Sequence, residues 1–281
     1  MSSRLSGGWG DLTGRVALVT GAGSDSGIGF ACARVLASRG AGIMVTSTTD
    51  RIFKRAAALA GEGATAHGVV AELTDEAQAA DLVTETLALF GRLDVLVNNA
   101  GMTSVSEPDR SAPLLDTTPA QWRASLERNL TTAFLVTRAA LPAIRAAALC
   151  RIINFASVTG PVAAMLNETA YAAGKAGMVG MTRALALEVA GRGVTVNAVA
   201  PGWIRTASSD EHELAMGEAT PVGRPGTADE VAAAVTFLAS PEASYVTAET
   251  IVVDGGNAMM EEKGPSSGDG LQPASPAPAA D

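Results

Sequence analysis

Metal-binding and disulfide-forming side chains are scarce in this chain of 281 residues, which has two cysteines and two histidines. Cys32, Cys150, His67 and His212 are far apart in the sequence. No pair has the short spacing of a metal site, so we predict no bound metal. Each cysteine stands among apolar residues. We therefore predict two buried free thiols and a reducing, cytoplasmic location rather than a disulfide.

Basic residues and long apolar runs are scarce as well. The chain has 20 Lys and Arg against 29 Asp and Glu, a net charge of -9. That balance argues against a clustered basic surface of the kind that binds nucleic acid. The longest apolar runs, such as residues 231–239, fall far short of the ~20 residues that span a bilayer. The first twelve residues lack the apolar stretch of a secretory signal. We expect neither nucleic acid nor membrane as a partner.

The chain does contain a regular alternation of short β-branched runs and longer helical stretches. The seven runs are Val16–Thr20, Ile43–Thr46, His67–Val70, Val95–Asn98, Ile152–Phe155, Val194–Val199 and Thr250–Val253. This alternation predicts an α/β fold with a parallel sheet. We predict one domain over residues 11–260, a flexible N-terminus over 1–10, and a disordered tail over 261–281, which is rich in Pro, Ser, Gly and Ala.

Capping residues indicate where several of the helices begin. Predicted caps are Asp50, Thr118 with Gln121, and Thr227 with Glu230, the last two pairs being capping boxes. We expect Pro142 to kink or shorten the helix that begins at Thr118.

Small, polar or turn-forming residues follow the predicted strands. They are residues 21–29, Ser47 with Thr48, Glu72, residues 99–101, Ser157, and residues 201–206. Because ligands of an open parallel sheet bind beyond the carboxyl ends of its strands, these residues predict a cleft for an extended polar ligand. The segments 103–115, 159–167 and 207–219 are the predicted walls and lid of the substrate site.

The stretch VTGAGSDSGIG at residues 19–29 stands where a phosphate-binding loop would join a strand to a helix. Ser26 occupies the third glycine position of G-x-G-x-x-G, and no lysine follows Gly27 as in a P-loop. A glycine-rich loop can still present backbone N–H groups to a pyrophosphate at a helix N-terminus. A plain glycine-rich turn is the alternative.

Tyr171 and Lys175 are four residues apart in a helical stretch and so share one face. A nearby ammonium favours the phenolate, which lets a tyrosine exchange a proton below its usual pKa of about 10. Tyr171 is therefore a candidate general acid or base. The same spacing also occurs on solvated helix faces without a function. The functional interpretation is favoured here because Ser157 and the glycine-rich loop accompany the pair.

These motifs, taken in order, resemble those of the short-chain dehydrogenase/reductase family. They are TGAGSDSGIG, NNAG at 98–101, RNL around Asn129, ASVTG around Ser157, YAAGK at 171–175, APGWIRT at 200–206 and VDGG at 253–256. The resemblance covers roughly residues 11–256. It implies a single-domain, Rossmann-type, doubly wound parallel sheet of seven strands flanked by helices.

The family's catalytic roles fall on four residues. By resemblance, Tyr171 donates a proton to a carbonyl oxygen while a nicotinamide delivers hydride to the carbonyl carbon, and Lys175 holds the nicotinamide ribose and lowers the pKa of Tyr171. Ser157 would hydrogen-bond the substrate oxygen, and Asn129 would anchor the water of a proton relay. The separation of Ser157 and Tyr171, 14 residues, is about one more than usual in the family.

The resemblance also names the residues that hold the dinucleotide. They are Gly21, Ser24, Gly27, Ile28, Gly29, Ser47, Thr48, Arg51, Glu72, Leu73, Asn99, Ala100, Gly101, Tyr171, Lys175, Pro201, Gly202, Ile204 and Thr206. The glycine loop has two more residues between Gly21 and Gly27 than the family motif. Either it bulges outward, or Ser24, Asp25 and Ser26 meet the ribose and phosphates differently. We expect Asp25 to point to solvent.

Ser47 stands where NAD-specific relatives place an Asp. An Asp there would repel a 2′-phosphate, whereas hydroxyls and Arg51 can bond it, so NADP is favoured over NAD.

The family resemblance, in particular to 3-oxoacyl-carrier-protein reductases and related ketoreductases, implies reduction of a ketone or 3-oxoacyl thioester. The substrate is then a small carbonyl compound, free or carrier-bound, and the protein is a homo-oligomer, a dimer or homotetramer. Two alternatives are an alcohol dehydrogenase that works oxidatively with NAD and a nucleotide-binding regulator without catalysis.

Overall fold

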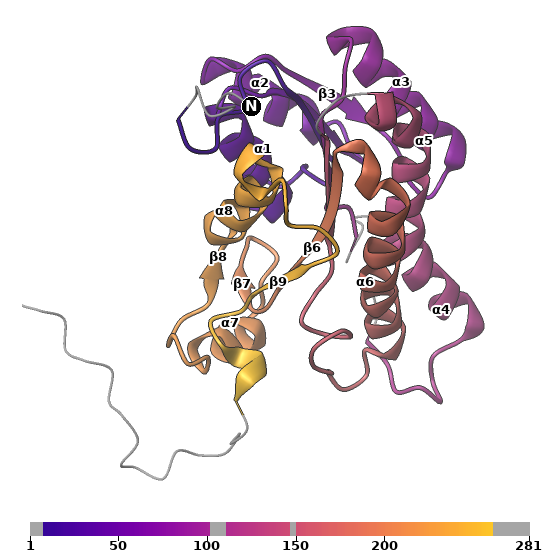
Figure 1. Cartoon of the computed structure of the whole chain (residues 1–281). Helices are drawn as coiled ribbons and strands as arrows, with labels where there is room; N and C mark the ends of the chain where they lie inside the picture. The colour runs from indigo at the N-terminus through magenta and orange to yellow at the C-terminus, as the bar shows by residue number, and fades with distance from the viewer. Residues whose placement is uncertain (1–7, 102–110, 147–149, 261–281) are drawn as a thin grey trace, which may run out of the picture.

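A computed structural model of the chain describes residues 8–101, 111–146 and 150–260. Seven parallel strands form one sheet in the order β3-β2-β1-β4-β5-β6-β9 (Figure 1). They are β1 Val16–Val19, β2 Gly42–Ser47, β3 Ala66–Val70, β4 Val95–Asn98, β5 Cys150–Phe155, β6 Val194–Pro201 and β9 Thr250–Val253. Each predicted β-branched run is a strand of this sheet, so the predicted fold class is confirmed.

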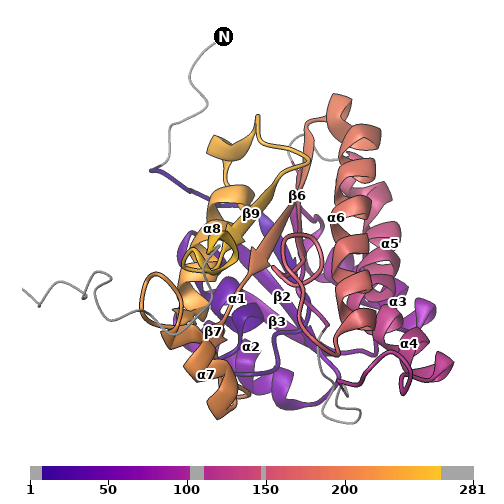
Figure 2. The same cartoon turned by 90° about the horizontal axis from the view of Figure 1, so that it is seen from below.

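Helices cover both faces of the sheet. One face carries α1 Ile28–Ser38, α2 Arg51–Gly61 and α8 Ala228–Ala239, and the other carries α3 Glu76–Phe90, α5 Thr132–Ala146 and α6 Thr169–Val189. The view from below shows the two groups apart, with α4 Pro119–Leu126 on the side of α6 (Figure 2). Side chains that alternate along the strands enter the two cores: Val19 packs on the α1 side and Leu18 on the α3 side. Such two-sided burial explains why the strands read as continuous apolar runs.

A small lobe stands at the carboxyl edge of the sheet. Two short strands, β7 Ile204–Arg205 and β8 Gly226–Thr227, pair in parallel, and helix α7 Glu211–Glu218 lies between them in the chain (Figure 1). The sequence analysis does not identify β7 and β8, because two residues carry no detectable periodicity. Most of the predicted lid, residues 207–219, is α7.

Two of the predicted helix caps are confirmed in full, and the third is confirmed in position only. Thr118 with Gln121 and Thr227 with Glu230 form complete capping boxes. Asp50 precedes α2, but its side chain makes no capping hydrogen bond. Its backbone is already helical, with φ -62 and ψ -10, whereas a capping residue is normally extended.

Of the two effects predicted for Pro142, shortening of the helix is not observed, because α5 continues through Pro142 to Ala146. The kink stays a prediction. The interruption lies earlier, at a π-helical turn, η1 Glu127–Thr131, between α4 and α5. The lost N–H of Pro142 costs one hydrogen bond, which the packing of α5 on the sheet and α3 outweighs.

Cys32 and Cys150 are both buried and free, as predicted. The tail at 261–281 and the first seven residues of the predicted flexible N-terminus lie outside the described residues. Among the helices that the structure describes, none has the length and apolar character to cross a membrane.

Candidate active site

The glycine-rich loop is fastened to the end of the neighbouring strand. The Thr20 hydroxyl accepts hydrogen bonds from the backbone N–H groups of Asn99 and Ala100, both at 3.0 Å. In return, the Asn99 amide donates to the carbonyl oxygens of Thr20 and Gly21. These bonds fix the loop after β1 against the turn after β4.

Glycine is required where this loop meets helix α1. A Cβ on Gly29 would lie 2.6 Å from the Gly21 carbonyl oxygen, so any larger residue would push α1 away. Gly27 is the N-cap of α1 and supplies no capping side chain. By contrast, Asp75 caps α3 through the N–H groups of Ala77 and Gln78. The first-turn N–H groups of α1 and its dipole thus fit a pyrophosphate.

Gly23, Ser47 and Arg51 converge at the end of β2. A Cβ on Gly23 would lie 2.8 Å from Ser47 Cβ and 3.7 Å from Arg51 Nη2. The Ser47 hydroxyl donates to the Thr49 carbonyl at 2.8 Å, and Arg51 Nε donates to the Thr49 hydroxyl at 3.0 Å. Thr48 is exposed beside them. This corner offers a guanidinium and hydroxyls, a donor set that fits a phosphate.

Glu72 and Leu73 follow β3. The Glu72 carboxylate accepts from the Thr74 N–H and hydroxyl at 3.3 and 3.0 Å, which closes a local turn. The Leu73 side chain is buried in the core on the α3 side, so only its backbone could meet an adenine. The adenine contacts of these two residues stay a prediction.

Lys175 lies beneath Tyr171 on α6, as their spacing predicts. Its ammonium is 5.6 Å from the centroid of the Tyr171 ring and donates to the Phe155 carbonyl at 3.0 Å. The Lys175 side chain is 3% exposed. Burial lowers the pKa of Lys175 to about 8, so the ammonium form still predominates at neutral pH. A phenol near a buried ammonium is suited to proton transfer.

Asn129 stands in the π-helical turn η1 and is fully buried. Gly174 lets α6 approach it, because a Cβ there would lie 3.1 Å from Asn129 Cβ. The Asn129 Oδ1 and the Lys175 Nζ both face Gly101, at 3.1 and 3.4 Å from the position of a Cβ on that residue. The Asn129 amide donates to the Ser125 carbonyl at 3.1 Å. The structure therefore brings Asn129 and Lys175 together at the end of β4.

Ser157 begins the loop that follows β5. Its hydroxyl accepts from the Thr159 N–H at 3.1 Å, which leaves its own proton to donate to a substrate oxygen. A Cβ on Gly160 would lie 2.4 Å from the Ala172 carbonyl oxygen, so glycine lets this loop press against the start of α6. Further on, Leu166 is 89% exposed and Asn167 has a φ of +67, which forms a turn directly before α6. That the additional residue between Ser157 and Tyr171 is accommodated in this exposed turn stays a prediction.

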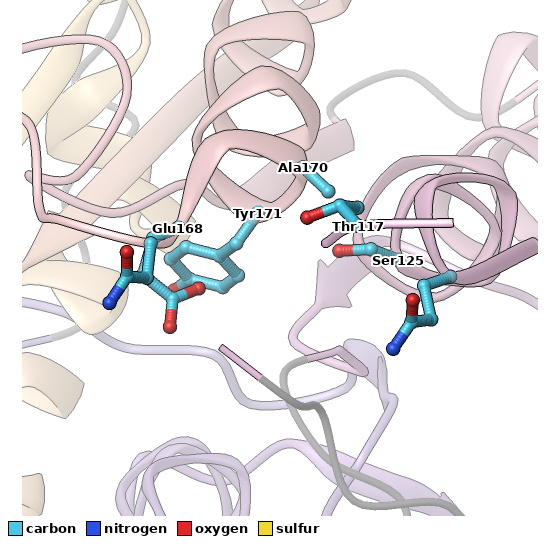
Figure 3. A pocket seen from close by; sticks show the side chains of 7 residues that line it. Thr117, Ser125, Glu168, Ala170 and Tyr171 are labelled. Carbon is cyan, nitrogen blue, oxygen red and sulfur yellow. The ribbon is translucent and has the colours of Figure 1, made fainter. Parts of the chain in front are cut away.

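A small polar pocket opens on one side of the Tyr171 ring (Figure 3). Glu168 and Tyr171 line one wall, and Thr117 and Ser125, from the turn before α4 and from α4 itself, face them. Gln121, Asn167 and Ala170 complete the lining. The predicted wall at 103–115 lies partly outside the described residues, which resume at 111.

The segment after β6 lies beside the Ser157 loop. The Val158 N–H donates to the Pro201 carbonyl at 3.1 Å, and the Gly202 N–H donates to the Val253 carbonyl at 3.0 Å. Ile204 pairs with Gly226 in the small lobe. The Thr206 N–H donates to the Ser209 hydroxyl at 3.0 Å, which starts the lid.

Asp25 is 69% exposed, in line with the expectation that it points to solvent, and it also pairs with Arg55 on α2 at 3.4 Å. The sequence analysis missed this ion pair. It also missed a buried polar network in which the Asn98 amide donates to Thr137 and Asn154, and the Asn154 amide donates to Thr182. Asparagines inside otherwise apolar strands are the signal that could have revealed this network.

Comparison with known proteins gives consistent matches over nearly the whole domain. The model of the family described as enoyl-(acyl carrier protein) reductase matches residues 21–258. A 3-oxoacyl-(acyl-carrier-protein) reductase of Salmonella typhimurium is 40% identical over 251 residues, which cover 88% of this chain and 98% of that protein.

Solved structures match equally well. One from Burkholderia xenovorans, described as a short-chain dehydrogenase/reductase, is 36% identical with a TM-score of 0.82 and covers 89% of this chain and 99% of its own. Another, from Beutenbergia cavernae, is described as an NAD(P)-dependent gluconate 5-dehydrogenase with bound NADP at low occupancy. It is 40% identical with a TM-score of 0.82, and covers 90% of this chain and 100% of its own.

Proposed function

The chain belongs to the short-chain dehydrogenase/reductase family and is therefore an NAD(P)-dependent oxidoreductase, and we propose that it is an NADPH-dependent ketoreductase of 3-oxoacyl thioesters. The observation that carries the proposal is the buried Lys175 ammonium beneath the Tyr171 ring, with Asn129 facing the same point at the end of β4. The 40% identity to a 3-oxoacyl-(acyl-carrier-protein) reductase supports the substrate class.

The chain's own residues perform the proton chemistry. When bound, the nicotinamide supplies the hydride that the carbonyl carbon receives. Tyr171 donates its phenolic proton to the carbonyl oxygen, and the Ser157 hydroxyl bonds that oxygen as negative charge develops on it. Lys175 holds the cofactor ribose, favours the phenolate that is left on Tyr171, and, with Asn129, returns a proton from solvent.

NADP is the proposed cofactor because the corner formed by Gly23, Ser47 and Arg51 offers a guanidinium and hydroxyls. Asp25, the acid of the glycine loop, is neutralised by its ion pair with Arg55, which lies one turn of α2 beyond Arg51. The solved structure with bound NADP at 40% identity supports this choice. The remaining cofactor contacts, from Gly21 to Thr206, are proposed from the positions that they share with the family motifs.

Turnover assays with three substrate classes test the proposal. The purified protein receives NADPH or NADH with a 3-oxoacyl thioester, a 2-enoyl thioester, or a 5-oxo sugar acid, and cofactor oxidation is followed. We expect kcat/KM to be highest for NADPH with the 3-oxoacyl thioester. Faster reduction of the enoyl thioester, or no turnover of either thioester, would contradict the substrate assignment.

Oxidation of a secondary alcohol is the second candidate. The 40% identity to a structure described as a gluconate 5-dehydrogenase favours it. Oxidation of the alcohol is the reverse of ketone reduction and would use the same residues, with Tyr171 as the base. Kinetics distinguish the two candidates. If the protein is an alcohol dehydrogenase, kcat/KM for oxidation of gluconate with NAD or NADP exceeds kcat/KM for reduction of the 3-oxoacyl thioester.

A homo-oligomer, dimer or tetramer, is also proposed. Large apolar side chains exposed on the helices and the edge strand support it: Phe134 on α5 is 47% exposed, Leu187 on α6 81%, and Val252 on β9 37%. Sedimentation equilibrium measures the state, and a monomer at micromolar concentration would contradict it.

A further inference from the structure

The glycine loop is in contact with the lid. The Ser26 hydroxyl accepts a hydrogen bond of 2.9 Å from the backbone N–H of Ala207, which is 181 residues away in the sequence. Ser26 follows β1, and Ala207 comes two residues after β7. In the sheet, β4 and β5 stand between β1 and β6. The hydrogen bond therefore joins two segments from opposite sides of the site.

The loop extension is anchored on its other side as well. Asp25 pairs with Arg55 of α2 at 3.4 Å, and the Arg55 guanidinium lies 5.5 Å from the centroid of the Phe30 ring on α1. The loop that contains Ser26 is therefore connected to α2 through Asp25 and Arg55, and to α1 through Arg55 and Phe30.

Ala207 is tied to the rest of the lid. The Thr206 N–H donates to the Ser209 hydroxyl, and that hydroxyl donates to the Ile204 carbonyl at 3.1 Å. One residue later, Asp210 caps α7. His212 on α7 also meets Trp203 edge-on, with ring centroids 6.3 Å apart. Because these contacts join residues 203–212 into one unit, a restraint at Ala207 acts on α7.

We propose that Ser26 is a positioning residue that latches the lid over the dinucleotide groove. The inference rests on the proposed function, since the residues on either side of the latch, 21–29 and 201–206, are those proposed to hold the dinucleotide. With the hydrogen bond made, the loop and the lid close around that groove. A bound dinucleotide then leaves only after the bond opens, so Ser26 slows cofactor release.

Two variants and a matched control test the latch. Ser26→Ala removes the acceptor, and Ser26→Thr keeps a hydroxyl. Ser38→Ala removes a hydroxyl from α1 that donates to the Val35 carbonyl within the same helix. The NADPH dissociation rate is measured by stopped-flow fluorescence. Hydrogen exchange of the Ala207 amide is measured in the full-length protein without cofactor. Thermal melting shows whether each variant is folded.

We expect Ser26→Ala to release NADPH about twofold to tenfold faster, the range for loss of one hydrogen bond between neutral groups. Exchange at Ala207 should accelerate by a similar factor. Ser26→Thr and Ser38→Ala should stay close to the wild type in both measurements. An unchanged release rate in Ser26→Ala, or equal acceleration in Ser26→Thr, would overturn the latch.

The two proposals fail in different ways. If the wild type binds neither NADPH nor NADH, the proposed function is wrong. The exchange measurement needs no cofactor, and unchanged exchange at Ala207 in Ser26→Ala would overturn the latch alone.

Discussion

The phenolic hydroxyl of Tyr171 is the group that we expect to donate the proton. Tyr171→Phe keeps the ring over Lys175 and removes only this donor. We expect kcat with a 3-oxoacyl thioester to fall at least ~100-fold, the lower end for general acid catalysis. The Kd for NADPH, measured by fluorescence, should stay nearly unchanged. A variant that retains more than a tenth of the wild-type kcat would show that another group donates the proton.

Because of Lys175, we expect the free energy of unfolding to change with pH in the alkaline range. Its pKa is about 8 in the folded protein and 10.5 for an unperturbed lysine. Between these values the unfolded chain binds more protons, so the free energy of unfolding rises with pH. The penalty of burying the ammonium is complete below pH 8 and is relieved as pH rises toward 10.5.

Lys175→Met removes this titration and serves as the reference. Between pH 8 and 10.5 the wild type should gain about 3 kcal/mol relative to the variant, since one pKa unit is worth about 1.4 kcal/mol. Urea unfolding of both proteins across this range measures the difference. A difference that does not change with pH would mean that the lysine keeps its ordinary pKa.

Ser47 is the residue that we propose selects between NADP and NAD at the end of β2. Ser47→Asp places a carboxylate where a 2′-phosphate is proposed to sit. Two like charges about 4 Å apart repel by up to ~4 kcal/mol at an effective dielectric of 20, and solvent and salt reduce this. We expect the ratio of kcat/KM for NADPH to that for NADH to fall by about one to two decades. If the ratio is unchanged, Ser47 does not face the 2′ position.

At the scale of elements, the approach of α6 to the π-helical turn η1 sets the position of Asn129. Gly174→Ala adds a Cβ at 3.1 Å from Asn129 Cβ, so one of the two elements must shift. Gly180 is a matched control, because it lies in the same helix with no atom within 4 Å of an added Cβ. Gly180→Ala should stabilise the protein by about 0.5–1 kcal/mol through helix propensity.

We expect Gly174→Ala to unfold at a lower temperature than Gly180→Ala and to lose turnover, which Gly180→Ala retains. Thermal melting and kcat of the two variants test this. Equal melting temperatures together with equal turnover would show that the helices can move apart without displacing Asn129.

Strands and several helix starts could be predicted because their signals are local. The seven β-branched runs and the capping boxes at Thr118 and Thr227 each depend on a few neighbouring residues. The π-helical turn η1 was not predicted, because it lies between two helical segments and has no side-chain cap of its own. For Pro142, tertiary packing outweighed the local tendency of proline to end a helix. For Asp50, the backbone is already helical, so the side chain does not cap α2.

At the scale of the whole molecule, the parallel sheet brings the candidate site together. Because all seven strands end at one edge, the residues that follow them were predicted to share a cleft, and the structure places Asn129, Tyr171 and Lys175 around the ends of β4 and β5. Bonds between loops, such as Ser26 with Ala207 or Asp25 with Arg55, leave no periodic signal in the sequence. They become visible only once the loops are placed in space.

Transfer of a labelled hydride tests the central claim most directly. The wild type is incubated with NADPH deuterated at the transferred position and a 3-oxoacyl thioester, and the product is analysed by mass spectrometry and NMR. A ketoreductase should place one deuterium on the new carbinol carbon, with Tyr171→Phe forming the same product far more slowly. A parallel incubation replaces the 3-oxoacyl thioester with a 2-enoyl thioester. Deuterium in the product of the enoyl thioester alone, or no labelled product from the 3-oxoacyl thioester, would contradict the claim.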